Sequence, residues 1–156
     1  MKRSELICGS VVAEKGNEAN RIKVNGITPR KIQYIDESKQ PKYLRHSQLV
    51  PIELNDFILG QLGFEKRQAT FGKVVRNDFV LVLVNKKDEN EFYTIVAEPD
   101  EELGWGKCRA IHIDDARYSS AGFGYVCNVH ELQSLIFSTI KMHLNTEKLF
   151  EGCGEE

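Results

Sequence analysis

The chain has 156 residues, of which 41% are hydrophobic and 28% are charged, a composition typical of a globular protein and not of a disordered or membrane protein. Its longest uninterrupted apolar run, Phe79 to Val84, is far shorter than the ~20 residues that a membrane-spanning helix needs. No apolar segment follows the basic residues Lys2 and Arg3, as it would in a secretory signal. We therefore expect a globular, cytoplasmic protein without a membrane partner.

Charge is distributed unevenly along the chain. Residues 1–51 contain ten Lys or Arg and five Asp or Glu, a net charge of +5, whereas residues 52–156 contain eleven and eighteen, a net charge of −7. This asymmetry indicates two regions with different surfaces. Together with a change of pattern near Pro51, it predicts a small module over residues 1–50 and a larger α+β domain over residues 51–156.

The cysteines give no sign of a disulfide framework. Cys8, Cys108, Cys127 and Cys153 are widely separated, and no two of them form a Cys-x-x-Cys pair. Secreted domains that depend on disulfides are usually shorter and richer in cysteine. The sequence favours four free thiols in a reducing compartment.

The first fifty residues predict short β-strands. Apolar and β-branched residues dominate 6–13, and polar and apolar residues alternate over 21–24 and 31–35. Asn25-Gly26 is typical of a type I′ hairpin turn between two such strands. Strands this short cannot cover both faces of an open sheet, and closure removes exposed edges. We therefore expect a small SH3-like β-barrel.

The second region begins with a short helix and continues as a sheet. Asn55 is a helix N-cap and Gly63 a terminating glycine, which predicts a helix around Phe57 to Leu62. Strands are expected at 64–75 (a pair bent at Gly72), 79–84, 92–97 and 105–113. The wholly apolar run 79–84 predicts a central strand covered on both faces.

The last predicted element is a long amphipathic helix. Asn128 is its expected N-cap, and Glu131 completes a capping box. Apolar residues recur at helical spacing, at Val129, Leu132, Leu135, Ile136, Ile140 and Leu144. The expected fold class is α+β: a mainly antiparallel sheet packed by the short helix and by this C-terminal helix.

Three segments, Glu5 to Val12, Val50 to Lys66 and Val129 to Phe137, carry a resemblance to a known family. They resemble, in the same order, an uncharacterised family of small proteins encoded by phages, plasmids and other mobile elements of gut anaerobic bacteria. Cys8 and Ser10 depart from the usual start of that family. The resemblance implies a shared fold and a mobile-element context, and it brings no activity or binding residue with it.

Catalytic and metal-binding patterns are incomplete. His130-Glu131 begins a helix, as in zinc proteases, but the second histidine of that motif is replaced by Ser134. Cys108, His112, Cys127 and His130 are zinc-ligand types, yet a strand would hold the first two about 13 Å apart. The glycine-rich segment 119–124 lacks the Lys-Ser/Thr of a phosphate loop and predicts an ordinary flexible loop. We therefore expect no catalytic residue, metal or cofactor, and a non-enzymatic protein.

The basic N-terminal region is the strongest functional signal. Positive and aromatic side chains that can follow a phosphate backbone and stack on bases are interleaved there. The candidate nucleic-acid-binding residues are Lys23, Arg30, Lys31, Tyr34, Lys42, Tyr43 and Arg45.

Three functions stay open at this point. The first is an accessory protein of a mobile element that binds a protein partner through its sheet or helix surface. The alternative is a nucleic-acid-binding protein that uses the basic module to bind DNA or RNA. The third is an enzyme whose site brings His112, Asp114 and Cys127 together in a deep pocket. The oligomeric state is not specified by the sequence.

Overall fold

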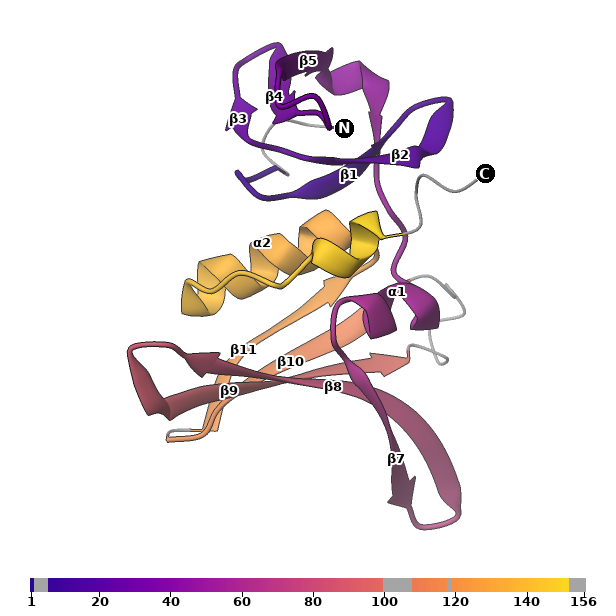
Figure 1. Cartoon of the computed structure of the whole chain (residues 1–156). Coiled ribbons are helices and arrows are strands. Elements are labelled where there is room, and N and C mark those ends of the chain that lie inside the picture. Colours follow the sequence, from indigo (N-terminus) through magenta and orange to yellow (C-terminus); the bar gives the residue numbers. More distant parts are fainter. Residues whose placement is uncertain (2–5, 100–107, 118, 152–156) are drawn as a thin grey trace.

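The computed structural model describes residues 1, 6–99, 108–117 and 119–151, and it shows a sheet-rich protein of mixed α and β structure. One long helix, α2, lies between a layer of N-terminal strands and a larger sheet (Figure 1). The expected α+β class is confirmed at this level. No helix in the described ranges is both long and apolar enough to cross a membrane.

The N-terminal strands form two small antiparallel sheets. The elements are β1 (Val11–Glu14), β2 (Asn17–Lys23), β3 (Gly26–Ile27), β4 (Lys31–Ile35), β5 (Pro41–Arg45), the 3-10 helix η2 (His46–Gln48) and β6 (Leu49–Val50). One sheet has the order β2-β1-β6 and the other the order β3-β4-β5. The described strands therefore do not close into the barrel that the sequence predicted.

The predicted hairpin turn at Asn25-Gly26 is wrong. The Val24 N–H donates to Ser10 O and the Asn25 N–H donates to Gln33 O, both at 2.8 Å, so the chain passes directly from the first sheet into the second. Gly26 does not have the positive φ of a type I′ turn. A Cβ at Gly26 would lie 3.1 Å from Gln33 Oε1, so the glycine serves a close approach to β4.

The C-terminal region is a five-stranded antiparallel sheet with helices on one face. Its elements are α1 (Asp56–Gln61), β7 (Glu65–Phe71), β8 (Val74–Asn85), β9 (Asp88–Pro99), β10 (Arg109–Asp115), β11 (Ser119–Val126), α2 (Val129–Ile140) and the 3-10 helix η3 (Glu147–Phe150). The strand order is β11-β10-β9-β8-β7. Asn55 caps α1 as expected, because its Oδ1 accepts the Ile58 N–H at 2.8 Å.

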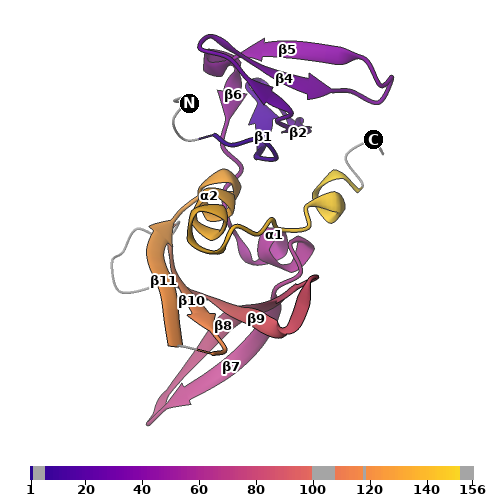
Figure 2. The same ribbon diagram turned by 90° about the vertical axis from the view of Figure 1, so that its left-hand side faces the viewer.

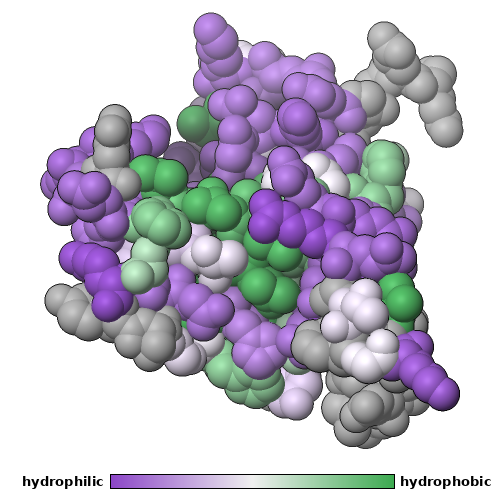
Figure 3. All heavy atoms as spheres, turned by 90° about the horizontal axis from the view of Figure 1, so that it is seen from below, coloured by the Kyte–Doolittle hydropathy of each residue, from purple (hydrophilic) through white to green (hydrophobic). Residues whose placement is uncertain are grey.

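Both helices cover the same face of this sheet, and the opposite face is open (Figures 1 and 2). Ile95 and Ile111 are fully buried under α2, whereas Val82 and Val84 are 45% and 46% exposed. The prediction that strand 79–84 is covered on both faces is therefore wrong. Figure 3 looks onto the open face and shows hydrophobic side chains gathered near its centre, with hydrophilic ones around them.

The segment predicted as a glycine-rich loop is in fact the edge strand β11. A Cβ at Gly122 would lie 2.7 Å from Thr139 Cγ2, and one at Gly124 would lie 3.1 Å from Leu135 Cδ2. These two glycines therefore let α2 pack closely against the strand. Their role is contact with a helix rather than flexibility.

Helix α2 is shorter than predicted. It ends after Ile140, because Lys141 adopts a left-handed conformation with φ of 57°. Asn128 stands at the N-cap position but makes no side-chain cap; its Nδ2 donates to Glu131 Oε1 at 2.7 Å instead. Glu131 Oε2 accepts the Cys127 N–H at 3.2 Å. Hydrogen bonds to a carboxylate are stronger than those between neutral groups, which explains this arrangement.

The expectation of four free thiols is also wrong. Cys108 and Cys127 form a disulfide, with their Cα atoms 4.0 Å apart, and Cys8 is free and exposed. The pair Arg109↔Val126 is the last of the β10–β11 register, so the next residues of the two strands face each other. The 19-residue separation hides this proximity in the sequence. Cys153 and residues 105–107 of the predicted strand 105–113 lie outside the described residues.

Strand β1 joins the two layers. Val11 belongs to the hydrophobic cluster of the larger sheet and Val12 to that of the N-terminal strands. Beside them, the buried Gln133 of α2 accepts the Val11 N–H at 2.8 Å and donates to Gly9 O at 2.9 Å. The division into modules 1–50 and 51–156 stays a prediction.

We expect Gln133→Leu to destabilise the protein. The leucine fills the same space but leaves the buried N–H of Val11 and the carbonyl of Gly9 without their partner, at about 1–3 kcal/mol for each group. Urea unfolding measures the change, and Ser138→Ala at an exposed position of α2 should change stability by less than ~0.5 kcal/mol. Equal stabilities of Gln133→Leu and wild type would show that this contact does not hold the layers together.

Candidate nucleic-acid interface

The outer face of the β3-β4-β5 sheet carries a pair of cations. Ile32 is fully buried, so its neighbours Lys31 and Gln33 point to the other side of β4. The register places Lys31 opposite Arg45 and Gln33 opposite Tyr43. This basic face therefore consists of two cations in one row and an amide with an aromatic ring in the next.

Like charges directly opposite each other destabilise a sheet. Within the described residues, neither Lys31 nor Arg45 forms an ion pair that would offset this repulsion. Lys42, on the other side of the same strand as Arg45, lies 3.9 Å from Asp36. The row Lys31–Arg45 is thus a concentration of unneutralised positive charge.

Local hydrogen bonds fix the backbone that carries these side chains. Thr28 Oγ1 donates to Lys31 O at 2.9 Å and accepts the Lys31 N–H at 3.0 Å. A ring nitrogen of His46, Nε2, lies 3.0 Å from Thr28 O. On the next strand, Gln48 Oε1 accepts the Arg45 N–H at 2.9 Å. The backbone of both cations is therefore held by local hydrogen bonds.

A pocket of about 630 Å³ opens beside this row of cations. It is lined by Pro29, Arg30, Lys31, Arg45, His46 and Ser47. Arg30 adds a third cationic group, and it also has no ion pair within the described residues. The lining contains no carboxylate, so the pocket is suited to an anion.

Tyr43 gives the basic face an exposed aromatic ring. Its side chain is 58% exposed, one row away from Lys31 and Arg45. An exposed tyrosine on a sheet is a surface on which a nucleic-acid base can stack. A cation row next to such a ring fits a strand whose phosphates and bases are both accessible.

The structure divides the seven predicted residues into two groups. Arg30, Lys31, Tyr43 and Arg45 gather at the basic face and its pocket. Tyr34, Lys42 and Lys23 do not: the first two point to the opposite side of the sheet, and Lys23 lies on β2 of the other sheet.

The Tyr34 side chain packs inside the layer of N-terminal strands. It lies against the buried cluster that contains Ile32 and Leu44. Burial, together with the nearby carboxylates of Glu14 and Asp36, raises the pKa of the Tyr34 hydroxyl. Gln33 was not among the predicted residues, although the alternation along 31–35 places it on the same side as Lys31.

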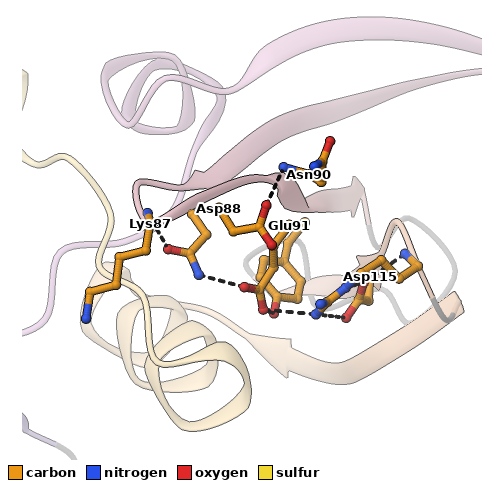
Figure 4. A network of polar contacts seen from close by, with 8 residues as sticks. Lys87, Asp88, Asn90, Glu91 and Asp115 are labelled. Atoms are coloured by element: carbon orange, nitrogen blue, oxygen red, sulfur yellow. Dashed lines mark hydrogen bonds and ion pairs between the residues drawn. The ribbon is translucent and has the colours of Figure 1, made fainter.

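A second polar cluster lies on the larger sheet, where β8 turns into β9 and β10 turns into β11 (Figure 4). Glu91 Oε1 accepts hydrogen bonds from the Tyr93 hydroxyl at 2.8 Å and from Arg117 Nη2 at 2.9 Å, and Glu91 Oε2 accepts from Asn85 at 2.7 Å. Arg117 also contacts Asp115 through its backbone N–H at 2.8 Å. Both carboxylates, Glu91 and Asp115, are therefore already paired, which is typical of a structural network.

The hydrogen bonds of the network shift the pKa values of its members. The Tyr93 hydroxyl, followed by the Asn85 amide and Arg117, lowers the pKa of Glu91. The backbone N–H of Arg117 and its guanidinium lower the pKa of Asp115. The bond to Glu91, more than burial, raises the pKa of Tyr93.

The residues suggested for an assembled catalytic site are not brought together. Cys127 is in the disulfide, and His112 Nε2 lies 3.2 Å from Glu98 Oε1 on the open face. Asp114 is exposed on the same strand as His112. Across the described ranges, no group of three or more His, Cys, Asp or Glu side chains is arranged to hold a metal ion.

Comparison of this chain with protein-family models, characterised proteins and solved structures finds no match. Its function is therefore inferred from its own surface chemistry, above all from the basic face.

The polar network predicts acid sensitivity. Since the folded-state pKa values of Glu91 and Asp115 are lowered, their stabilising effect is complete above the unfolded values of about 4 and is lost as pH falls through the folded values. Glu91→Gln should therefore lower stability at pH 7, and its stability should fall less than that of wild type between pH 5 and pH 2. Parallel curves in urea titrations across this range would contradict the prediction.

Proposed function

We propose that this protein binds single-stranded nucleic acid through Lys31, Tyr43 and Arg45 of the basic face and through Arg30 of the adjoining pocket. The observation that carries the proposal is the cross-strand row Lys31–Arg45, which has no neutralising carboxylate among the described residues. This row stands beside the pocket lined by Arg30 and beside an exposed ring. Phosphates would bind the three cations, and a base would stack on Tyr43.

Two features favour a single strand over a duplex. The ring of Tyr43 offers a stacking surface, which a paired base inside a duplex cannot reach. The cations lie on a sheet face and a turn, and none of the three lies on an α-helix that could enter a major groove. Contact with phosphates and base faces implies little sequence preference.

We also propose that the protein carries out this binding as an accessory protein of a mobile element. The resemblance to mobile-element proteins supports a non-enzymatic, cytoplasmic accessory role, in which nucleic acid is bound rather than cleaved. The two three-stranded sheets, joined by a chain that passes from β2 directly into β3, support an SH3-like ancestry for residues 6–50.

A second candidate function, protein binding, is favoured by the open face of the larger sheet. Antiparallel sheets with one open face usually carry polar residues there. Here, large apolar side chains are exposed instead: Val82, Val84, Phe92, Phe123 and Tyr125. Contiguous apolar patches of this kind mark interaction sites.

The salt dependence of binding tests the role of the cations. Three phosphate contacts to a single strand give a slope of log K against log salt of about −2, at ~0.7 for each contact. Lys31→Glu combined with Arg45→Glu should weaken binding of a labelled oligothymidine and bring the slope to about −0.7. Fluorescence anisotropy at several salt concentrations measures both.

Lys66→Glu combined with Arg67→Glu is the matched control for this experiment, because it makes the same charge change at exposed positions of β7. It should leave affinity and slope nearly unchanged. If the control weakens binding as much as the combined Lys31→Glu and Arg45→Glu variant does, the interaction follows net charge and the basic face is not the site.

The stacking role of Tyr43 is tested separately. Tyr43→Ala should weaken oligonucleotide binding by about 1–3 kcal/mol without changing the salt slope, because it removes a stacking surface and no charge. Tyr43→Phe should bind like wild type. Phe57→Ala, at another exposed aromatic residue, is the control and should have no effect. A normal affinity of Tyr43→Ala would show that bases do not stack here.

A further inference from the structure

We propose that the pocket beside the basic face binds the phosphorylated end of a nucleic-acid strand, so that a terminal phosphomonoester enters the pocket and the adjoining base stacks on Tyr43. This inference rests on the proposed function, because it names the part of the strand that the same site binds. Three features support it: the position of the pocket at one end of the basic face, the cations that meet there, and the apolar surface at the other end of the face.

The pocket lies where the β3-β4-β5 sheet ends. β4 begins at Lys31 and β5 ends at Arg45, and these two residues stand opposite each other and both line the pocket. Beyond them, the walls come from the connection between β3 and β4, which contains Pro29, and from η2, which contains Ser47. Nucleic acid that follows the basic face therefore meets walls built by other segments at this end, which favours a chain end over an uninterrupted chain.

A hydrogen bond links the two walls of the pocket. Nε2 of His46, in η2, lies 3.0 Å from the carbonyl oxygen of Thr28, in the connection between β3 and β4. A carbonyl oxygen only accepts hydrogen bonds, so Nε2 carries the proton of this bond. The walls are therefore held together before a ligand enters, which lowers the cost of ordering the site on binding.

The charge of the pocket matches the end of a chain better than its middle. Among the described residues, Arg30, Lys31 and Arg45 line it without any carboxylate, and none of the three forms an ion pair. An internal phosphodiester has a single negative charge, whereas a phosphomonoester has about −1.5 to −2 at pH 7. A terminal phosphate and the diester next to it thus bring nearly one negative charge for each cation. Ser47 adds a hydroxyl that can donate to a phosphate oxygen.

The opposite end of the basic face is apolar. Ile35, on the same side of β4 as Lys31, is 56% exposed and stands opposite Pro41 of β5. Between these two ends lies the row of Gln33 and Tyr43. An uninterrupted chain would bring phosphates to every part of the face, but the row at Ile35 has no cation to receive one. We therefore expect the phosphate at the pocket and the bases on Tyr43 and toward Ile35.

Competition binding with the full chain tests which part of the strand is bound. A labelled oligothymidine is displaced by unlabelled oligothymidines of equal length with a phosphate at the 5′ end, at the 3′ end or at neither. We expect at least one phosphorylated competitor to bind about tenfold more tightly than the unphosphorylated one, the effect of one added hydrogen bond between charged groups. Equal affinities of all three would overturn the inference and leave the proposed function intact, whereas no binding of any oligothymidine would overturn both.

Thymidine 5′-monophosphate and thymidine 3′-monophosphate distinguish a strand end from a free nucleotide, which carries the same phosphomonoester. Both lack the adjoining diester and the second base that the face would bind. They should therefore compete at least about tenfold less well than the preferred oligothymidine, because a stacked base and a phosphate contact are lost. Competition as strong as that of the oligothymidine would show that the pocket takes a free nucleotide and would overturn the inference of a strand end.

Arg30→Gln tests whether the pocket is responsible, because Arg30 lines the pocket and is exposed. It should remove most of the preference for the phosphorylated end, measured as the ratio of the two affinities. Arg67→Gln, the same change at an exposed position of β7, is the control and should keep the ratio. A preference that persists in Arg30→Gln, or one that is lost equally in both variants, would overturn the inference. Circular dichroism verifies that each variant is folded.

Phosphorus NMR gives a second readout at the phosphate itself, because the terminal phosphomonoester and the internal diesters have separate resonances. Adding the protein should shift the terminal resonance of the preferred oligothymidine, and Arg30→Gln should reduce this shift. Shifts confined to the diester resonances would contradict entry of the terminal phosphate into the pocket.

Discussion

The structure depends on one constraint: helix α2 is covered on two opposite sides. Leu132 and Ile136 pack on the larger sheet, while Gln133 faces β1. A backbone N–H or C=O that is buried must find a partner, and here the side-chain amide of Gln133 provides it for both Val11 and Gly9. A polar residue can therefore occupy a buried helix position and join two layers of strands. Because α2 separates the layers, the β3-β4-β5 sheet and the open face of the larger sheet lie at opposite ends of the molecule (Figure 1).

Local signals in the sequence were predictive where a few neighbouring residues decide the structure. The cap at Asn55 and the turn at Gly72, with φ of 62°, need no information from elsewhere in the chain. Gly26 and Gly122 were misinterpreted because a glycine that permits close packing looks the same as one that permits a turn. The difference lies in Gln33 and Thr139, and only the fold brings those residues near.

The prediction that both faces of the apolar run 79–84 are covered was wrong for a related reason. An uninterrupted apolar strand indicates that both of its faces are apolar, but it does not show that both are covered. The helices reach one face, and Val82 and Val84 stay exposed on the other. The candidate binding residues show the same limit: composition selected seven, and strand parity and register reduced them to Arg30, Lys31, Tyr43 and Arg45. Register depends on pairing between strands, which charge counting along the chain does not contain.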